Sequence, residues 1–334
     1  MVTLKDIAQA VNRSVTTVSR ALSGCSDVNA ETASQIRETS KRMGYVPNVY
    51  AQRLQKQSTD TIGIVVPSTS RGHAEPFFSE FLAGIGEKAT EYGYDLLVTY
   101  ISEENQVATY RKLVEGRRVD GFIIYRTLRD DPRVNYLHGI GMPFATFGQV
   151  ENISDYIYID EDGEYAMGLI ACHLAAKGHR RIACICPPSS VMYSHIRLRG
   201  LVKGLEEQGI KLAPDLVREG FFDQKDGYEQ TMALLDLDNP PTAIVGFNDM
   251  IAFGIINAAK NRKLKIGRDL AVTGFDDNTM APFYRPPLTT IRQPTYEIGG
   301  MLVQFLIDHI RANDPKARKP QVLLRPELIV REST

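Results

Sequence analysis

The 334-residue sequence lacks the long apolar runs and catalytic motifs that mark membrane proteins and several classes of enzyme. No run of about 18 apolar residues is present, which excludes a membrane-spanning helix. The first residues do not have the charged-then-apolar layout of a secretory signal, so we expect a cytoplasmic protein. The motifs G-x-S-x-G, H-E-x-x-H and G-x-x-x-x-G-K-[ST] are absent, and Gly84-x-Gly86 lacks the rest of a dinucleotide fingerprint. We therefore predict no enzymatic activity, no catalytic residues and no cofactor.

Cysteine and histidine are also scarce. The six His form no cluster with the cysteines, which argues against a metal site. The four cysteines (Cys25, Cys172, Cys184 and Cys186) have no spacing typical of a disulfide framework. Cys184 and Cys186 lie in an apolar run where both would face the same side of a strand. We therefore predict that they are buried free thiols.

The charge that is present is divided unevenly along the chain. A hydrophobic fraction of 43% and a mean hydropathy of −0.20 are typical of a globular protein with a sizeable core, and the length allows two or three domains. Residues 1–56 hold eight Lys and Arg against four Asp and Glu, a net charge of about +4, whereas the whole chain carries −1. The basic N-terminal segment and the acidic remainder suggest that the N-terminal segment alone binds a polyanion.

The first 24 residues have the pattern of two short helices joined by a tight turn. Thr3 and Asp6 form a T-x-x-D capping signal, Asn12-Arg13 is a turn signal, and Ser14 is a second N-cap candidate. The second helix would run from Val15 to about Leu22, with an outer side formed by Val15, Thr16, Thr17, Ser19 and Arg20. This pattern is typical of a DNA-reading helix-turn-helix, although any amphipathic helical pair has the same spacing.

A third helix and a linker follow. The third helix is predicted from Ala30 to Met43 and ends at Gly44, which closes a small three-helix unit over residues 1–46. Residues 47–60 could form a further short helix, which would be marginal without a partner. The alternative is a flexible linker whose Leu54 packs on the body.

From Thr61 onward, short apolar β-branched runs alternate with helical patterns. This alternation predicts parallel sheets with right-handed crossovers. One set of strands closes near Asp160 and a second set of similar size follows, which predicts two lobes that face each other across a cleft. Ligands of such sheets bind beyond the carboxyl ends of the strands. The predicted fold class is an all-α helix-turn-helix headpiece followed by a bilobal α/β domain with two parallel, doubly wound sheets.

The amino-acid sequences of these motifs resemble those of the LacI/GalR family of bacterial transcription regulators. The headpiece motif is KDIAQAVNRSVTTVSRALSG, and the resemblance continues in order over essentially the whole chain through MGYVPNVYAQRL, TIGIVVPS, RRVDGFII, YIYIDEDGEYAMG, KGHRRIA, PTAIVGFNDMIAFG, LAVTGFDD, PPLTTIRQP and RPELIVRES. It implies a body similar to the periplasmic sugar-binding proteins. The implied N-lobe spans about 61–160 and 292–319, and the implied C-lobe about 161–291 and 320–334.

The resemblance also implies how the protein would meet DNA. Val15, Thr16 and Arg20 match base-reading positions, while Ser14, Thr17, Ser19 and Tyr45 match phosphate partners. Arg20 could pair bidentately with a guanine or, alternatively, clamp a phosphate. The linker would form a hinge helix whose Leu54 wedges between base steps in the minor groove. Family members that form tetramers carry an apolar heptad helix beyond the position of Thr334, so a homodimer is favoured.

The cleft would hold a small effector. Four polar residues at strand ends or in the loops that follow match effector-contacting positions of the family, namely Asp160, Arg197, Asn248 and Asp276. Three aromatic positions match as well (Phe78, Phe147 and Phe222), and Arg126 and Tyr193 are predicted from their location. Alternatively, Asp160 could serve only as a cap between the lobes without contacting the effector, and the phenylalanines could be core residues. Asp249 is expected to cap the helix that follows it.

The resemblance therefore predicts a DNA-binding repressor controlled by a small carbohydrate. The stretches PFFSEFLAGIGEKA and YRTLRDDPRV look like those of regulators of α-glucoside or oligosaccharide use. The pair Arg197 and Asp276 serves both purine and sugar binders in the family, so a purine or a sugar phosphate is the alternative effector. A sugar-binding protein without DNA activity is the more distant alternative.

Overall fold

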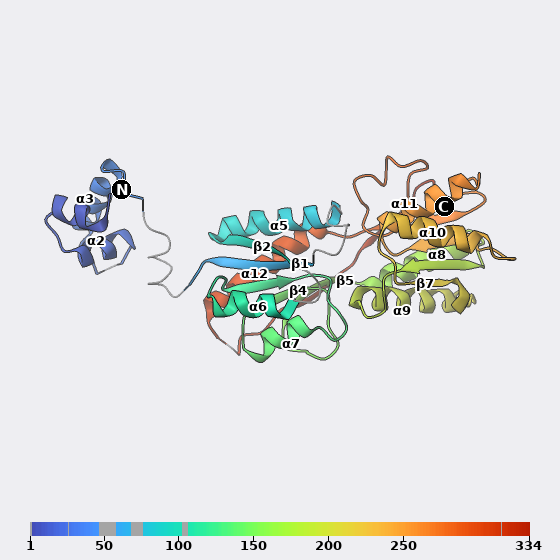
Figure 1. Ribbon diagram of the computed structural model, residues 1–334, viewed down its shortest axis with the longest axis horizontal. Coiled ribbons are helices and arrows are strands. Elements are labelled where there is room, and N and C mark those ends of the chain that lie inside the picture. The colour runs from blue at the N-terminus through green and yellow to red at the C-terminus, as the bar shows by residue number, and fades with distance from the viewer. Residues whose placement is uncertain (1, 26, 47–57, 68–75, 102–105, 315) are drawn as a thin grey trace. The chain divides into compact units, whose positions relative to one another are not determined.

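The computed structural model describes residues 2–25, 27–46, 58–67, 76–101, 106–314 and 316–334. The chain divides into two compact units, Met1–Ser58 and Thr59–Thr334, which we call the headpiece and the body. Figure 1 shows both units and labels many of their elements. Residues 47–57 lie outside the described part of the chain. They include most of the predicted hinge helix and Leu54. None of the helices in the described part of the chain combines the length and apolar character needed to span a bilayer.

The headpiece contains the predicted helix-turn-helix. Its helices in the described residues are α1 (Leu4–Ala10), α2 (Val15–Leu22) and α3 (Ala30–Arg42). Thr3 and Asp6 form a reciprocal capping box at α1, and the Ser14 side chain accepts a hydrogen bond from the Thr17 N–H at the start of α2. Asn12 in the turn has a φ of 51°, a conformation that Asn tolerates better than most residues. Both capping predictions are confirmed, and Ile7, Val18 and Ile36 form a small common core.

The N-lobe of the body is built on a six-stranded parallel sheet in the order β11-β5-β4-β3-β1-β2. Its strands are β1 (Thr61–Pro67), β2 (Asp95–Ile101), β3 (Gly121–Ile124), β4 (Phe144–Phe147), β5 (Ile157–Glu161) and β11 (Gln321–Leu324). The helices that cover it are α5 (Pro76–Tyr92), α6 (Gln106–Glu115), α7 (Pro132–Gly139) and α12 (Thr295–Ala312). Ile62, Ile64 and Val66 of β1 pack with α5 and α12, and Val65 packs with α6 and α7. Alternate residues therefore bury both faces of the sheet. Figure 1 shows α5 on one side of the N-lobe strands and α6 and α7 on the other.

The C-lobe repeats this plan around a four-stranded parallel sheet in the order β7-β6-β8-β9. Its strands are β6 (Ile182–Cys186), β7 (Val217–Glu219), β8 (Ala243–Gly246) and β9 (Ala271–Thr273), and its helices are α8 (Gly163–Ala176), α9 (Met192–Glu207), the 3₁₀ turn η2 (Pro214–Leu216), α10 (Gln224–Leu235) and α11 (Asp249–Asn261). Cys184 and Cys186 pack with α8 and α9, while Ala183 and Ile185 pack with α10 and α11. Both cysteines are buried and free, as predicted.

The segments that pass between the lobes differ from the prediction in one respect. The chain crosses after β5, between β10 (Thr290–Arg292) and α12, and between β11 and β12 (Glu327–Ile329), and β10 pairs with β12 antiparallel. The sequence analysis assigned residues 320–334 to the C-lobe. The structure places β11 in the N-lobe sheet, because its backbone pairs with the edge of β5 from Gln321↔Tyr158 onward. Only the residues after β11 return to the C-lobe.

Candidate functional site

The predicted DNA-contacting residues in and around the recognition helix α2 differ in their exposure at the headpiece surface. Val15 is 40% exposed although it is apolar, and Thr16 and Arg20 are exposed as well. Thr17 and Ser19 are half-buried. Tyr45 is also half-buried and packs against the headpiece core. Ser14 is exposed too, so the exposed members of the predicted set are Ser14, Val15, Thr16 and Arg20 among the residues described. The Ser14 and Thr17 hydroxyls lie 2.8 Å apart at the helix start.

In the body, a cavity with about 520 Å³ of empty space lies between the two lobes. Seven of the nine residues predicted for the effector line it: Arg126, Phe147, Asp160, Tyr193, Arg197, Asn248 and Asp276. Arg126 follows β3, and Asp160 is the second-last residue of β5. Asn248 and Asp276 follow β8 and β9, so these polar groups gather because the carboxyl ends of both parallel sheets face the same space.

Arg197 of α9 is a buried guanidinium at the centre of this polar set. Its Nη1 donates to the Phe247 carbonyl at 2.7 Å and its Nη2 to Glu161 Oε1 at 2.6 Å. The guanidinium also lies over two aromatic rings, 3.4 Å from the Phe275 centroid and 4.7 Å from the Tyr193 centroid. Its Nε is buried and has no hydrogen-bond partner among the described residues. A buried donor without a partner is costly, so this N–H is suited to a ligand acceptor.

Asp160 is fully enclosed and sits next to a second carboxylate. Its Oδ2 accepts from Gln149 Nε2 at 3.1 Å, and its Oδ1 accepts from the Glu161 N–H at 3.0 Å. Burial and the neighbouring charge of Glu161 raise the pKa of Asp160 well above its ordinary value. When it is protonated, this carboxyl group can donate a hydrogen bond as well as accept one.

Asp276 is held at the cavity by its backbone and by Gln293. The Asp276 N–H donates to the Ile291 carbonyl at 2.8 Å, and Gln293 Nε2 donates to Asp276 Oδ1 at 2.7 Å. Asp276 has a φ of 119°, an unusual conformation for a residue other than glycine. Gln293 Oε1 is buried without a hydrogen-bond partner in the described part of the chain. Gln293 is thus a second lining residue with an unsatisfied buried polar atom, this time an acceptor.

Asn248, rather than Asp249, caps helix α11. The Asn248 Oδ1 accepts from the Ile251 N–H at 2.7 Å, and its Nδ2 donates to the Phe222 carbonyl at 3.0 Å. The expectation that Asp249 caps this helix is therefore wrong. Asp249 is the first helical residue, and its carboxylate points instead to the Thr290 hydroxyl at 2.6 Å and the Asn278 N–H at 2.7 Å.

The aromatic side of the cavity is formed by Phe77 and Phe147, whose ring centroids lie 5.7 Å apart in a stacked arrangement. Phe78 does not line the cavity. It is buried in the N-lobe core against Tyr125, with ring centroids 5.1 Å apart. Phe222 does not line it either and is half-buried in the loop that its carbonyl ties to Asn248.

Five lining residues were not predicted from the sequence: Phe77, Thr127, Gly148, Glu161 and Gln293. Four of them adjoin predicted residues in the sequence, since Phe77 precedes Phe78, Thr127 follows Arg126, Gly148 follows Phe147, and Glu161 follows Asp160. Gln293 lies in the motif PPLTTIRQP, where its position just after β10 was the available signal. Within the described residues, no group of three or more His, Cys, Asp and Glu could hold a metal ion.

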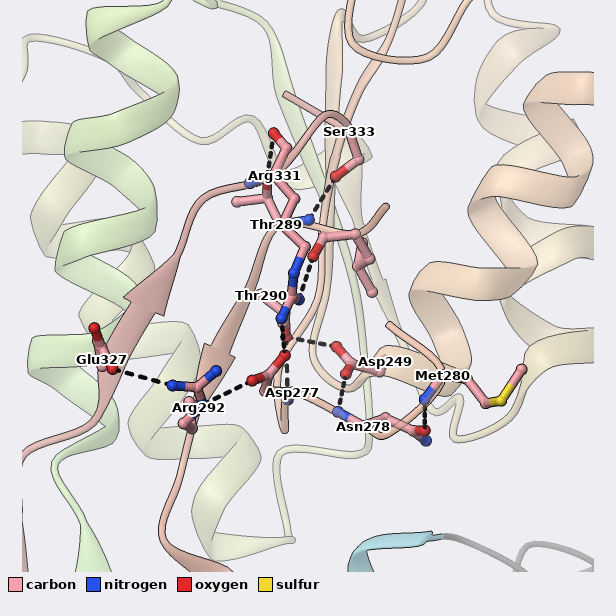
Figure 2. Close-up of polar contacts among 11 residues, drawn as sticks. Asp249, Asp277, Asn278, Met280, Thr289, Thr290, Arg292, Glu327, Arg331 and Ser333 are labelled. Carbon is pink, nitrogen blue, oxygen red and sulfur yellow. Dashed lines mark hydrogen bonds and ion pairs between the residues drawn. The ribbon is translucent and has the colours of Figure 1, made fainter. Parts of the chain in front are cut away.

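A polar network behind the cavity fixes the loop that carries Asp276. Asp277 accepts from Arg331 Nη2 at 2.6 Å and from Arg292 Nε at 2.7 Å, and Arg292 also pairs with Glu327 at 3.5 Å. Figure 2 shows Asp277 beside both arginines, with Asp249 next to Thr290 and Asn278. The loop after β9 is thereby tied to both hinge strands, β10 and β12.

The chain matches known proteins over its whole length. Residues 3–48 match the family described as "Bacterial regulatory proteins, lacI family", and residues 171–334 match the "Periplasmic binding protein-like domain". The HTH-type transcriptional regulator AglR of Rhizobium meliloti (strain 1021) is 35% identical over 341 residues, which cover 100% of this chain and 94% of AglR.

Two solved structures are similar to the whole chain. The lac repressor dimer bound to operator and the anti-inducer ONPF has a TM-score of 0.86 at 29% identity and covers 99% of this chain and 98% of its own. The complex of the transcriptional regulator CelR with cellobiose has a TM-score of 0.77 at 27% identity and covers 100% of both chains. These relatives are regulators of transcription and not enzymes. With its helix-turn-helix headpiece and its bilobal α/β body, the chain belongs to the lacI family of bacterial regulatory proteins.

Proposed function

We propose that the protein is a homodimeric repressor that binds operator DNA through α2 and is controlled by a small carbohydrate, an α-glucoside or another oligosaccharide, bound between the lobes. The observation that carries the carbohydrate assignment is the chemistry of the cavity. Buried donors and acceptors from Asp160, Arg197 and Asn248 surround a space with a stacked aromatic side. Sugars present hydroxyls to such groups and apolar ring faces to aromatic side chains. A repressor acting on operator DNA works in the cytoplasm.

The charges of the cavity favour a neutral sugar over a sugar phosphate. The ionisable side chains that line it are three acids (Asp160, Glu161 and Asp276) and two arginines (Arg126 and Arg197). The charge of Arg197 is already balanced by Glu161 at 2.6 Å. A phosphate would add negative charge beside the carboxyl groups of Glu161 and Asp276, which disfavours its binding. CelR, whose structure was determined with cellobiose, supports a disaccharide as an effector that a body of this fold can hold.

Effector control follows from the position of the cavity between the lobes. A ligand that bridges Asp160 of the N-lobe and Arg197 of the C-lobe stabilises one relation of the lobes over another. Such coupling between two sites is typically about 1–3 kcal/mol. For a regulator of carbohydrate use, we infer that the sugar is an inducer and favours the DNA-free state, whereas a purine corepressor would act in the opposite direction.

A thermal-shift screen tests the effector. The full chain is screened against mono- and oligosaccharides, nucleobases and sugar phosphates, and we expect an oligosaccharide to raise the melting temperature. At a ligand concentration of 100 times Kd, the stabilisation is about 2.7 kcal/mol. Arg197→Ala and Asp276→Asn should abolish the shift relative to their own ligand-free melting temperatures.

The matched controls are Arg262→Ala and Asp236→Asn, which break an exposed ion pair that does not line the cavity. These variants should retain the full shift. A nucleobase or sugar-phosphate hit, or an oligosaccharide hit that is indifferent to the cavity substitutions, would refute the carbohydrate assignment and leave the DNA-binding role intact.

Arg20→Ala tests the DNA-reading role of α2. A bidentate arginine–guanine contact supplies about 1–3 kcal/mol of discrimination. We therefore expect the variant to lose its preference among duplexes that differ at one G·C pair, while most of its binding to non-specific DNA remains. An unchanged preference, measured by fluorescence anisotropy, would contradict the base-reading role of Arg20.

A further inference from the structure

Arg20 is paired with a carboxylate of its own headpiece. Asp27, in the turn between α2 and α3, accepts from Arg20 Nε through Oδ1 at 3.3 Å, and its Oδ2 forms an ion pair with Arg20 Nη2. The two side chains are 53% and 50% exposed. The pair therefore lies at the headpiece surface, where the end of the recognition helix meets the turn that follows it.

The edge of the guanidinium that Asp27 occupies determines which edge is left. An arginine has five N–H donors, which form one fork from Nε and Nη2 and a second fork from Nη1 and Nη2. Asp27 takes the first fork through Nε and Nη2. The second fork is directed away from Asp27, along the extension of the side chain. In the major groove, guanine O6 and N7 are two adjacent acceptors that match such a fork.

We infer that Asp27 is a positioning residue that holds Arg20 so that its Nη1–Nη2 edge reads a guanine. This inference rests on the proposed base-reading role of Arg20. Holding a long side chain in one orientation reduces the freedom that it must lose on binding. A fixed orientation also limits the number of bases that the fork can reach, so that Asp27 contributes to specificity without contacting DNA.

The pair also bears on the alternative role of Arg20 as a phosphate clamp. Arg20 and Asp27 together have no net charge, and the carboxylate of Asp27 repels a phosphate that approaches the guanidinium. Attraction to the DNA backbone depends on unbalanced positive charge, whereas a base edge needs only correctly placed donors. The pairing therefore favours base reading over a phosphate contact.

The experiment compares DNA preference in four forms of the full chain. The wild type is first used to select its preferred duplex from a pool of randomised duplex DNA. Wild type, Arg20→Ala, Asp27→Asn and Glu38→Gln are then titrated, by fluorescence anisotropy, against three kinds of labelled duplex. These are the preferred duplex, versions in which each G·C pair is replaced in turn, and a non-specific duplex over a range of salt concentrations.

Glu38→Gln is the matched control, because Glu38 is an exposed acid of α3 that bonds to Ser34 and does not pair with Arg20. Glu38→Gln removes one negative charge from the headpiece, as Asp27→Asn does. Exposed ion pairs contribute little to folding stability, so Asp27→Asn should leave the headpiece folded, which far-UV circular dichroism checks.

Arg20→Ala should reduce the preference at one G·C pair about 5- to 150-fold, the range that a bidentate contact supplies. Asp27→Asn should reduce the preference at the same pair about two- to fivefold, the size expected of an exposed ion pair. The charge of Arg20 is then unbalanced, so the slope of log affinity against log salt for non-specific DNA should steepen by about 0.9 for each headpiece. Glu38→Gln should leave the base preference unchanged.

Two results would overturn the role of Asp27. One is full preference in Asp27→Asn alongside its loss in Arg20→Ala, which would leave the base-reading role of Arg20 standing. The other is an equal loss in Asp27→Asn and Glu38→Gln, which would reduce the effect to net charge. Unchanged preference in Arg20→Ala would instead refute the base-reading role on which the inference rests.

Discussion

The buried carboxyl group of Asp249 makes the stability of the C-lobe depend on pH in a way that one substitution can isolate. Asp249 is fully buried at the start of α11, where it accepts hydrogen bonds from Thr290 and Asn278. Burial is the main cause that raises its pKa from 3.8 to about 7. The nearby charge of Asp277 raises the pKa further, and Arg331 and the two hydrogen bonds oppose the rise.

The sign of the effect follows from which state holds the proton. Between pH 4 and pH 7, native Asp249 keeps a proton that the unfolded chain has lost, so the free energy of unfolding falls as the pH rises through this range. One pKa unit corresponds to about 1.4 kcal/mol, so this group alone should lower the free energy of unfolding by about 3 kcal/mol between pH 5 and pH 8. Above pH 7 its contribution levels off.

Asp249→Asn removes the ionisation and keeps the shape. The amide oxygen can accept from the Asn278 N–H, and the amide nitrogen can donate to the Thr290 hydroxyl. In urea unfolding at pH 5 and pH 8, the loss on raising the pH should be about 3 kcal/mol larger in the wild type than in Asp249→Asn. Asp238→Asn, an exposed acid of the same lobe, should behave like the wild type. Parallel losses in wild type and Asp249→Asn would refute the reasoning.

Two further substitutions test the packing and the caps. Gly84→Ala should destabilise the N-lobe by about 1–3 kcal/mol, because the new Cβ would overlap the Tyr296 carbonyl oxygen where α5 and α12 cross closely. Gly86→Ala on the same helix, where a Cβ meets no atom within 4 Å, should instead be neutral or stabilising in the same urea titration. Ser14→Ala removes the cap of α2 and should cost the headpiece about 1 kcal/mol, seen as a lower unfolding midpoint of the headpiece with unchanged unfolding of the body. An equal loss in the body would argue against the two-unit description.

Features that depend on local patterns were predictable from the sequence. The caps at Thr3 and Ser14 and the buried strands β1, β6 and β8 follow from side-chain chemistry and apolar runs that lie within a few residues of one another. The gathering of Asp160, Asn248 and Asp276 was also predictable, because parallel sheets bring the ends of their strands to one edge. Arg197 lies within α9 rather than at a strand end, and its place at the cavity was predicted from the family resemblance.

Features that change when an element shifts by a single residue were not predictable from the sequence. Successive residues of a helix differ by about 100° in direction, so whether Phe77 or Phe78 meets the cavity depends on how the first turn of α5 is seated. Asn and Asp are both good N-caps, and only the burial of Asp249 against β10 decides in favour of Asn248. The membership of β11 in the N-lobe depends on pairing with β5, more than 150 residues earlier in the chain, which no local pattern encodes.

The central claim is that a sugar in the interlobe cavity controls DNA affinity, and one titration tests it most directly. The labelled preferred duplex is bound to the full chain, and the sugar identified by thermal shift is added in increasing concentration while anisotropy is recorded. We predict that the sugar weakens DNA binding about 5- to 150-fold, the range of typical coupling, and that Arg197→Ala abolishes the response. A sugar that binds the cavity but leaves DNA affinity unchanged would contradict the account.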